Sequence, residues 1–292
     1  MPLTMTRPTA VSSPAIVWLG SPESTDHTIV GSKSAHLSAL APHHNVPPGF
    51  SITAQALRGL PLDEPLPEPL RAEIAAAYRQ LAASGDGHTP EVAVRASAVE
   101  QGATFAMQSR TQLNVVGVDA VIAAVEACRA AMAGLSARGY GSAGDFAILV
   151  QQMLRADVSA LVFSANPFSG DPGEAVITAT WGLGESLANG QVTPDSWVVD
   201  RASGEITEQH TGKKLRMTVA DIEGVREVDV TSALRYLPAL TTRQVRELTR
   251  LAASLEAHMG WPVDVECAIR GDQVYLLRCR PLATLNASTL AA

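Results

Sequence analysis

The chain has 292 residues, 46% of them hydrophobic and 17% charged, a composition typical of a folded protein with a well-buried interior. Its formal net charge of −7 argues against a broad nucleic-acid-binding surface, because nucleic-acid phosphates are bound by an excess of Lys and Arg. No run of about 18 uninterrupted apolar residues occurs, which excludes a membrane-spanning helix.

Cysteine usage and the N-terminus point to the cytoplasm. The three cysteines, Cys128, Cys267 and Cys279, are an odd number without the spacing of metal ligands, which suits a reducing compartment. Residues 1–14 contain no apolar run of signal-peptide length and have the character of a loose tail. We therefore expect a cytoplasmic protein.

The first half of the chain alternates short strands with helices. Residues 61–70 are rich in Pro and acidic residues, which is typical of a surface connection. The patterns predict strands at 15–19, 50–53, 92–97 and 111–116, and helices at 31–44, 53–60 and 71–84.

The second half begins with an alanine-rich helix over residues 118–138. A helix over 240–260, with Thr241 as a start signal and Gly260 as a stop, is expected to cover a sheet. Apolar, β-branched runs predict three strands of that sheet at 146–154, 159–167 and 174–184, and hairpins are predicted at 196–210 and at 263–280, the latter turning at Gly271-Asp272.

This order of elements indicates an α+β fold and not a run of βαβ units. The length allows two lobes, although it would also permit one large α/β unit. We expect a flexible tail at 1–14, an N-terminal lobe at 15–115, a C-terminal lobe at 116–285 and a second tail at 286–292.

A glycine-rich turn in the segment WGLGESLANGQVTPD, residues 181–195, is the first candidate for ligand binding. Gly182, Gly184 and Gly190 would leave backbone amides bare, and such loops suit phosphates. Glycines also mark tight turns without any ligand, so this motif alone does not decide the function.

Two basic residues are candidate phosphate ligands. Lys33 lies between a strand and a helix start, where a cation and free amides together can hold an anion. The segment is not a P-loop, because Ser32 precedes Lys33 where that motif requires glycine. Arg95 lies inside an apolar strand and needs a partner or an anionic ligand to offset its desolvation. A solvated lysine and a structural ion pair are the respective alternatives.

Polar residues elsewhere could surround the same ligand. The loop after Arg95 contains Gln108 and Thr111 and could fold over a phosphate. Gln151 and Gln152 interrupt an apolar strand before Met153, a pattern able to present backbone groups to a purine edge with Met153 against its face. Core packing would explain Met153 equally well.

Charged residues face each other across the C-terminal hairpin. Alternation places Asp264 and Glu266 on one face of their strand, and Arg278 and Arg280 share a face of the next. This arrangement predicts either a cross-strand salt bridge or a site in which Glu266 binds Mg²⁺ and Arg280 binds a phosphate.

Five blocks follow one another along the chain: VGSKSAHL with VPPGFSIT, VRASAVEQGATFAMQSRTQLNV, VQQMLRADVSALVFSANP, WGLGESLANGQVTPDSWVVD and PVDVECAIRGDQVYLLRCRPL. Together they resemble the ATP-binding domain shared by phosphoenolpyruvate synthase, pyruvate phosphate dikinase and rifampicin phosphotransferase. The resemblance implies a two-lobed, ATP-grasp-like fold that closes on ATP and Mg²⁺.

The same resemblance implies roles for individual residues. It gives Lys33, Arg95 and Arg280 catalytic contacts with the phosphates and makes Glu266 the metal ligand. It also implies that Gln108, Thr111, Gln151, Gln152, Met153, Glu185 and Arg278 contact the nucleotide.

Members of this family pass a phosphoryl group of ATP to a histidine on a separate domain and release AMP and phosphate. The Gly-Gly-Thr-x-x-His type of motif around that histidine has no counterpart among the seven histidines of this chain. We therefore expect a separate partner protein that carries the phosphohistidine or the acceptor domain.

Departures from the family pattern bear on the chemistry. Met107 and Arg110 stand where glycine and an acidic residue are usual, which makes the phosphate-covering loop bulkier and more cationic. Arg278 replaces a glutamine next to the metal and so removes an oxygen ligand. The leading hypothesis is an ATP-binding subunit of a dikinase-type phosphotransferase. The alternative is a catalytically degenerate nucleotide-binding or scaffolding module.

Overall fold

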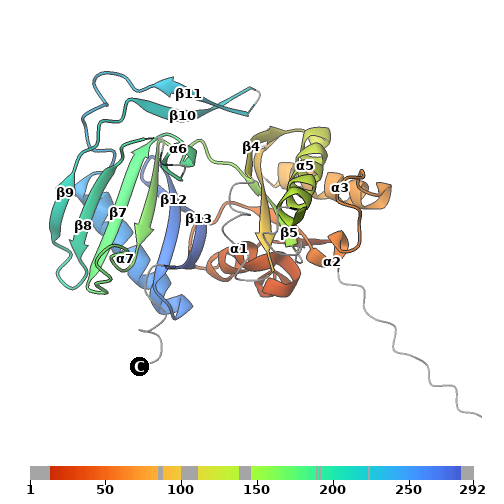
Figure 1. The fold of residues 1–292 in the computed structure, drawn as a ribbon, viewed down its shortest axis with the longest axis horizontal. Coiled ribbons are helices and arrows are strands. Elements are labelled where there is room, and N and C mark those ends of the chain that lie inside the picture. Colours follow the sequence, from red (N-terminus) through yellow and green to blue (C-terminus); the bar gives the residue numbers. More distant parts are fainter. Residues whose placement is uncertain are drawn as a thin grey trace, which may run out of the picture.

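Two antiparallel β-sheets lie next to each other and form two lobes (Figure 1). The structure, a computed structural model, describes residues 14–84, 88–99, 111–137, 146–188, 190, 192–222 and 224–283. The first sheet has the strand order β1-β2-β5-β3-β4. Its strands are β1 (Ile16–Trp18), β2 (Gly49–Ile52), β3 (Glu91–Ala98), β4 (Thr111–Val116) and β5 (Phe146–Gln152).

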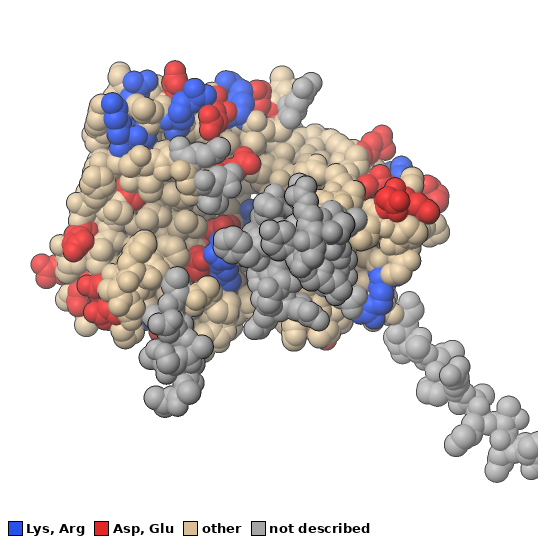
Figure 2. All heavy atoms as spheres, in the orientation of Figure 1, with Lys and Arg blue, Asp and Glu red and all other residues tan. Residues whose placement is uncertain are grey.

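The second sheet has the strand order β13-β12-β6-β7-β8-β9. Its strands are β6 (Val158–Phe163), β7 (Glu174–Trp181), β8 (Asp195–Asp200), β9 (Ile206–His210), β12 (Val263–Arg270) and β13 (Gln273–Pro281). A separate hairpin of β10 (Arg216–Asp221) and β11 (Gly224–Asp229) extends toward β4 of the first lobe (Figure 1). Basic and acidic atoms are mixed on this hairpin (Figure 2), and Arg226 pairs with Asp221 at 2.8 Å.

Helices cover one face of each sheet, and one helix lies between the sheets. Helices α3 (Glu68–Ala83) and α5 (Val118–Ala137) pack on the first sheet, and α7 (Thr242–Met259) packs on the second. Helix α1 (His27–Leu40) contacts β3, β5 and β13. The short helices are η1 (Pro22–Thr25), α2 (Ala54–Leu57) and α6 (Glu185–Ala188). Within the described residues, no helix combines the length and apolar character needed to cross a membrane.

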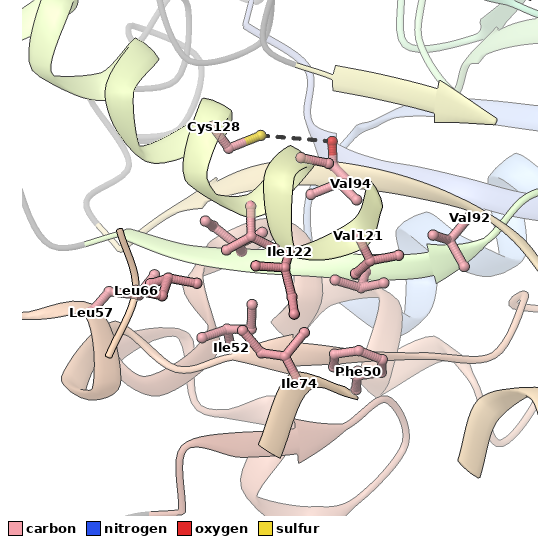
Figure 3. Packing of buried hydrophobic residues seen from close by; sticks show 14 of the residues in the cluster. Phe50, Ile52, Leu57, Leu66, Ile74, Val92, Val94, Val121, Ile122 and Cys128 are labelled. Atoms are coloured by element: carbon pink, nitrogen blue, oxygen red, sulfur yellow. Dashed lines mark hydrogen bonds between the residues drawn. The ribbon is translucent and has the colours of Figure 1, made fainter. Parts of the chain in front are cut away.

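The core of the first lobe follows from the alternation of side chains along β3. Val92 and Val94 point toward α3 and α5, where they belong to the same buried cluster as Ile74 (Figure 3). Arg95 and Ser97 occupy the intervening positions and therefore lie on the opposite face, which α1 contacts. The alternation thus directs Arg95 away from the apolar core and toward the second lobe.

The core of the second lobe forms between its sheet and α7. This helix begins with a reciprocal cap between Thr241 and Gln244 and ends at Gly260, which adopts a left-handed φ of 77°. The helix and both end signals are therefore confirmed. The second core also contains residues contributed by the first lobe: Leu37 and Leu40 of α1 and Leu149 of β5.

Helix α1 is interrupted at Gly31, two residues before Lys33. The helix begins at His27, preceded by the Asp26 carboxylate, which accepts a hydrogen bond from the Thr28 N–H. Gly31 leaves helical geometry, with φ 72° and ψ 163°. A Cβ atom at Gly31 would lie 2.3 Å from the Ser97 carbonyl oxygen, so glycine allows β3 to approach this closely.

The expected α+β fold with two lobes is confirmed, but the boundary between the lobes differs from the expected one. The sequence assigned β5 and α5 to a C-terminal lobe of residues 116–285. In the structure β5 pairs with β2 and β3, and α5 packs on the same sheet, so the first sheet extends to Gln152. The boundary at residue 115 is too early, because an apolar strand pattern does not show which sheet the strand joins.

Candidate functional site

Acidic and basic side chains of β12 and β13 face each other, as their alternation predicts. Asp264 is opposite Arg280, and Glu266 is opposite Arg278. Arg280 Nε lies 2.7 Å from Asp264 Oδ2, and Arg278 Nη1 lies 2.9 Å from Glu266 Oε1. Arg278 Nη2 is also 4.0 Å from Asp264 Oδ2. The hairpin therefore presents two linked guanidinium–carboxylate pairs on one face.

Arg95 reaches this group from the first lobe. Its Nη1 donates a hydrogen bond to the Leu277 carbonyl of β13 at 3.0 Å. Its Nε is buried and has no hydrogen-bond partner among the described residues. Burial lowers the pKa of Arg95; Glu266 opposes this shift and Arg278 adds to it. Arg95 therefore lies within electrostatic reach of the second-lobe pair, and it stays charged because a guanidinium is not deprotonated in proteins.

Lys33 joins the same group from α1. Its Nζ donates to the Ala96 carbonyl of β3 at 2.8 Å. Burial and the nearby charge of Arg95 lower the pKa of Lys33 to about 7, with a further contribution from Arg278 and an opposing one from Glu266. Lys33 therefore titrates near neutral pH, and an anion bound beside it would stabilise its protonated form.

Positive charge exceeds negative charge where the two lobes meet. Lys33, Arg95, Arg278 and Arg280 come from α1, β3 and β13, and the acids that pair or interact with them in the described residues are Asp264 and Glu266. The Nε atoms of Arg95 and Arg278 are buried without a hydrogen-bond partner there. An excess of cations at a desolvated position is stabilised by an anionic ligand. The structure thus brings together five of the charged residues that the sequence predicted for the site, namely Lys33, Arg95, Glu266, Arg278 and Arg280, with Asp264 added to them.

The polar residues expected near a nucleobase are largely engaged by the protein. Gln151 is buried, and its Nε2 donates to the Pro47 carbonyl at 3.0 Å. The N–H of Gln152 donates to the Pro48 carbonyl and that of Met153 to the Glu91 carbonyl, both at 2.8 Å. These two N–H groups are therefore not free for a purine edge, in contrast to the expectation.

Three further predicted residues have different outcomes. Thr111 is directly opposite Arg95 in the pairing of β3 with β4, so the two side chains share a face of the sheet. Glu185 is exposed at the start of α6, and no contact with the charged group is described for it. Gln108 lies outside the described residues.

The glycine-rich turn is used for packing. The Gly182 N–H donates to the Asp157 carbonyl, and the Leu183 N–H donates to the Thr218 carbonyl, both at 2.8 Å. A Cβ atom at Gly182 would lie 2.4 Å from the Thr218 carbonyl oxygen. Gly182 therefore permits a close approach of β10, and its own amide is not bare as the motif predicted.

Comparison with known proteins identifies the family. The family model for the pyruvate phosphate dikinase AMP/ATP-binding domain matches residues 57–292. The chain belongs to this family. The resemblance inferred from the sequence blocks is thereby confirmed, and the matched residues include the whole second lobe and the part of the first lobe that begins at Leu57.

Relatives of this dikinase-family domain include three longer proteins. The prodigiosin synthesizing transferase PigC of Serratia marcescens is 37% identical over 82% of this chain and 30% of its own length. Phosphoenolpyruvate synthase of Pyrococcus furiosus is 32% identical over 81% and 31%, and the phosphotransferase YvkC of Bacillus subtilis is 31% identical over 90% and 34%. The chain therefore spans about a third of the length of these relatives.

The donor set of this dikinase-family domain does not fit a divalent cation held by Glu266. Phosphoryl transfer implies Mg²⁺, which prefers oxygen ligands at regular octahedral positions. Glu266 is already paired with Arg278, and Asp264 is paired with Arg280. No group of three or more His, Cys, Asp or Glu side chains suited to a metal is found among the described residues. A cation bound to Glu266 would also face the positive charge of Arg278, so the expected metal role of Glu266 is not supported.

Asp264 completes the charged group, although the sequence gave a ligand role to Glu266 alone. The Asp264 side chain is buried, and its Oδ1 has no hydrogen-bond partner among the described residues. Its position two residues before Glu266, opposite a predicted arginine, was a signal that could have identified it.

A second buried ion pair was not predicted. Lys214 and Asp195 form an ion pair with both side chains fully buried. Asp195 also accepts hydrogen bonds from the N–H groups of Gly212 at 2.9 Å and Ala239 at 2.7 Å. The pair joins the start of β8 to the segments on either side of the β10–β11 hairpin. Nothing in the local sequence distinguishes these residues from surface charges.

Proposed function

We propose that the chain binds ATP where the two lobes meet and passes a phosphoryl group to a histidine or a small-molecule acceptor on a partner protein. The observation that carries this proposal is the proximity of Lys33, Arg95 and Arg278 to one another, with Arg280 joined to this group through Asp264. Membership in the AMP/ATP-binding domain family supports a nucleotide as the anion that offsets their charge.

The four cations are suited to phosphoryl transfer because they approach from both lobes. Lys33 and Arg95 belong to the first lobe, whereas Arg278 and Arg280 belong to β13 of the second. Phosphoryl transfer depends mainly on positioning and on neutralising charge on the phosphate oxygens. Fixed guanidinium groups supply such charge without reorganising during the reaction. Arg95 would orient the phosphates, because its hydrogen bond to Leu277 holds it against the second lobe.

The acceptor is expected on another protein or domain. The relatives are about three times as long as this chain, and their names differ in the reaction that they denote. This difference supports an acceptor determined outside the ATP-binding domain. The cytoplasm is the compartment that suits this proposal, since ATP is available there and the three free cysteines fit a reducing environment.

Formation of AMP tests the proposal. The chain is incubated with ATP and MgCl₂, with and without candidate partner proteins from the same genomic neighbourhood. We expect AMP to form with the correct partner, and we expect Arg95→Ala to abolish it while Arg250→Ala, an exposed change on α7, leaves it intact. The absence of ATP binding to the wild-type chain would refute the proposal.

A second candidate function is a nucleotide-binding module without turnover. The ion pair between Arg278 and Glu266 favours it, because a permanent cation occupies the carboxylate that would otherwise hold a catalytic metal. Tight ATP binding without AMP formation in any partner combination would support this module over the phosphotransferase.

A further inference from the structure

Arg278 is paired with Glu266, the carboxylate that was expected to bind the Mg²⁺ ion of ATP. The side chains of Arg278 and Glu266 are 15% and 19% exposed, so solvent screens their 2.9 Å contact only in part. Arg278 lies between both carboxylates of β12, since its other terminal nitrogen is 4.0 Å from Asp264. The guanidinium is therefore fixed by two acids at the centre of the charged group.

The same guanidinium retains unused hydrogen-bonding capacity. A guanidinium has five N–H donors, and those of Arg278 include the buried Nε, which has no partner among the described residues. The Nε of Arg95 is in the same state. Both buried donors lack an acceptor among the described residues and belong to arginines that interact electrostatically with each other, so an anion bound beside them would satisfy donors that these residues leave unpaired.

We infer that Arg278 takes the place of a divalent cation on Glu266, so that guanidinium groups hold the phosphates and ATP binds without a divalent cation. This inference rests on the proposed ATP-binding function. It differs from that function in what it requires of binding: the proposed function requires only that ATP binds with MgCl₂ present, whereas the inference requires binding of metal-free ATP.

Isothermal titration calorimetry of the full chain with ATP tests the inference directly. One series contains EDTA and the other contains excess MgCl₂ at the same ionic strength. We expect dissociation constants that agree within about threefold, because the charge that offsets the phosphates belongs to the protein. A loss of affinity of about tenfold or more in EDTA would overturn the inference and leave the proposed function intact. No binding in either series would refute the proposed function itself.

The variant Arg278→Gln separates the role of this residue from general electrostatics. It removes the cation and frees the Glu266 carboxylate, so we expect ATP affinity in EDTA to fall by about tenfold to a hundredfold and to recover in MgCl₂. Arg270→Gln is the matched control, because Arg270 is exposed at the far end of β12 and carries the same charge. An unchanged affinity of Arg278→Gln in EDTA would overturn the inference. Thermal unfolding of both variants establishes that they are folded. The comparison of wild-type ATP affinity in EDTA and in MgCl₂ tests the inference without either variant.

Discussion

Arg95 of β3 and Leu277 of β13 are joined by a hydrogen bond of 3.0 Å that crosses from the first lobe to the second. Arg95 uses one terminal nitrogen for this contact and keeps its buried Nε without a partner among the described residues. The residue therefore combines two functions that are hard to separate: it holds the lobes together, and it offers a charged donor where they meet.

The variant Arg95→Lys tests the geometric part of this role. Lysine keeps the positive charge but lacks the planar arrangement of donors that reaches Leu277 and a phosphate together. We expect ATP affinity to fall by about tenfold, measured by calorimetry at constant ionic strength. Arg250→Lys, on the exposed face of α7, serves as the control. Equal affinities of Arg95→Lys and the wild type would contradict a phosphate contact at this position.

The pKa of Lys33 predicts how ATP affinity depends on pH. In the free protein this pKa is lowered to about 7, and bound phosphates would raise it, so a proton is taken up with the nucleotide. Affinity should therefore decrease as pH rises above about 7, by at most about tenfold per pH unit.

Titrations between about pH 7.5 and about pH 9 measure this dependence. The variant Lys33→Arg carries a permanent charge and should bind with an affinity that changes little over this range. A wild-type affinity that stays constant over this pH range would show that Lys33 does not take up a proton when ATP binds.

The buried pair of Lys214 and Asp195 should dominate the stability of the second lobe. Lys214→Met leaves the Asp195 carboxylate buried without its cation, and we expect the free energy of unfolding to fall by about 3–5 kcal/mol. Arg226→Ala, which breaks the exposed pair with Asp221, should lower it by about 1 kcal/mol or less. Urea denaturation compares the two variants, and equal effects would contradict the structural role of the buried pair.

Two glycines with similar backbone angles provide a matched test at the site. Gly31 and Gly59 have φ values of 72° and 76°, but a Cβ atom would meet the Ser97 carbonyl at Gly31 and nothing within 4 Å at Gly59. Gly59→Ala should lower the free energy of unfolding by about 1–2 kcal/mol through backbone strain alone.

Gly31→Ala adds a steric clash to the same strain, so we expect a loss of about 3 kcal/mol or more. Gly31→Ala should also weaken ATP binding, because it displaces the part of α1 that carries Lys33. If the two alanine variants were equally stable, the close approach of α1 and β3 would not be the reason for glycine at position 31.

The charged hairpin was predictable from sequence because it depends on local rules. Alternation along two strands joined by the Gly271-Asp272 turn determines that Glu266 and Arg278 share a face, and the observed pairing agrees. The start and end of α7 were predictable for the same reason, since its cap residues act within one turn.

Relationships between distant segments could not be predicted in this way. The membership of β5 in the first sheet depends on its pairing with β2 and β3, which its apolar sequence does not specify. The use of Gly182 for packing against Thr218 depends on the β10–β11 hairpin, and the sequence patterns predicted no strands there. The pairing of Lys214 with Asp195 likewise requires the tertiary fold.

The contribution of Leu37, Leu40 and Leu149 to the second core has a consequence for dissecting the molecule. A gene split between β5 and β6 would yield an N-terminal fragment with these leucines exposed to water and a C-terminal fragment with unfilled space beneath its sheet. Neither fragment would be a self-sufficient folding unit. Co-expression of the two fragments should restore solubility, because each supplies the apolar surface that the other lacks.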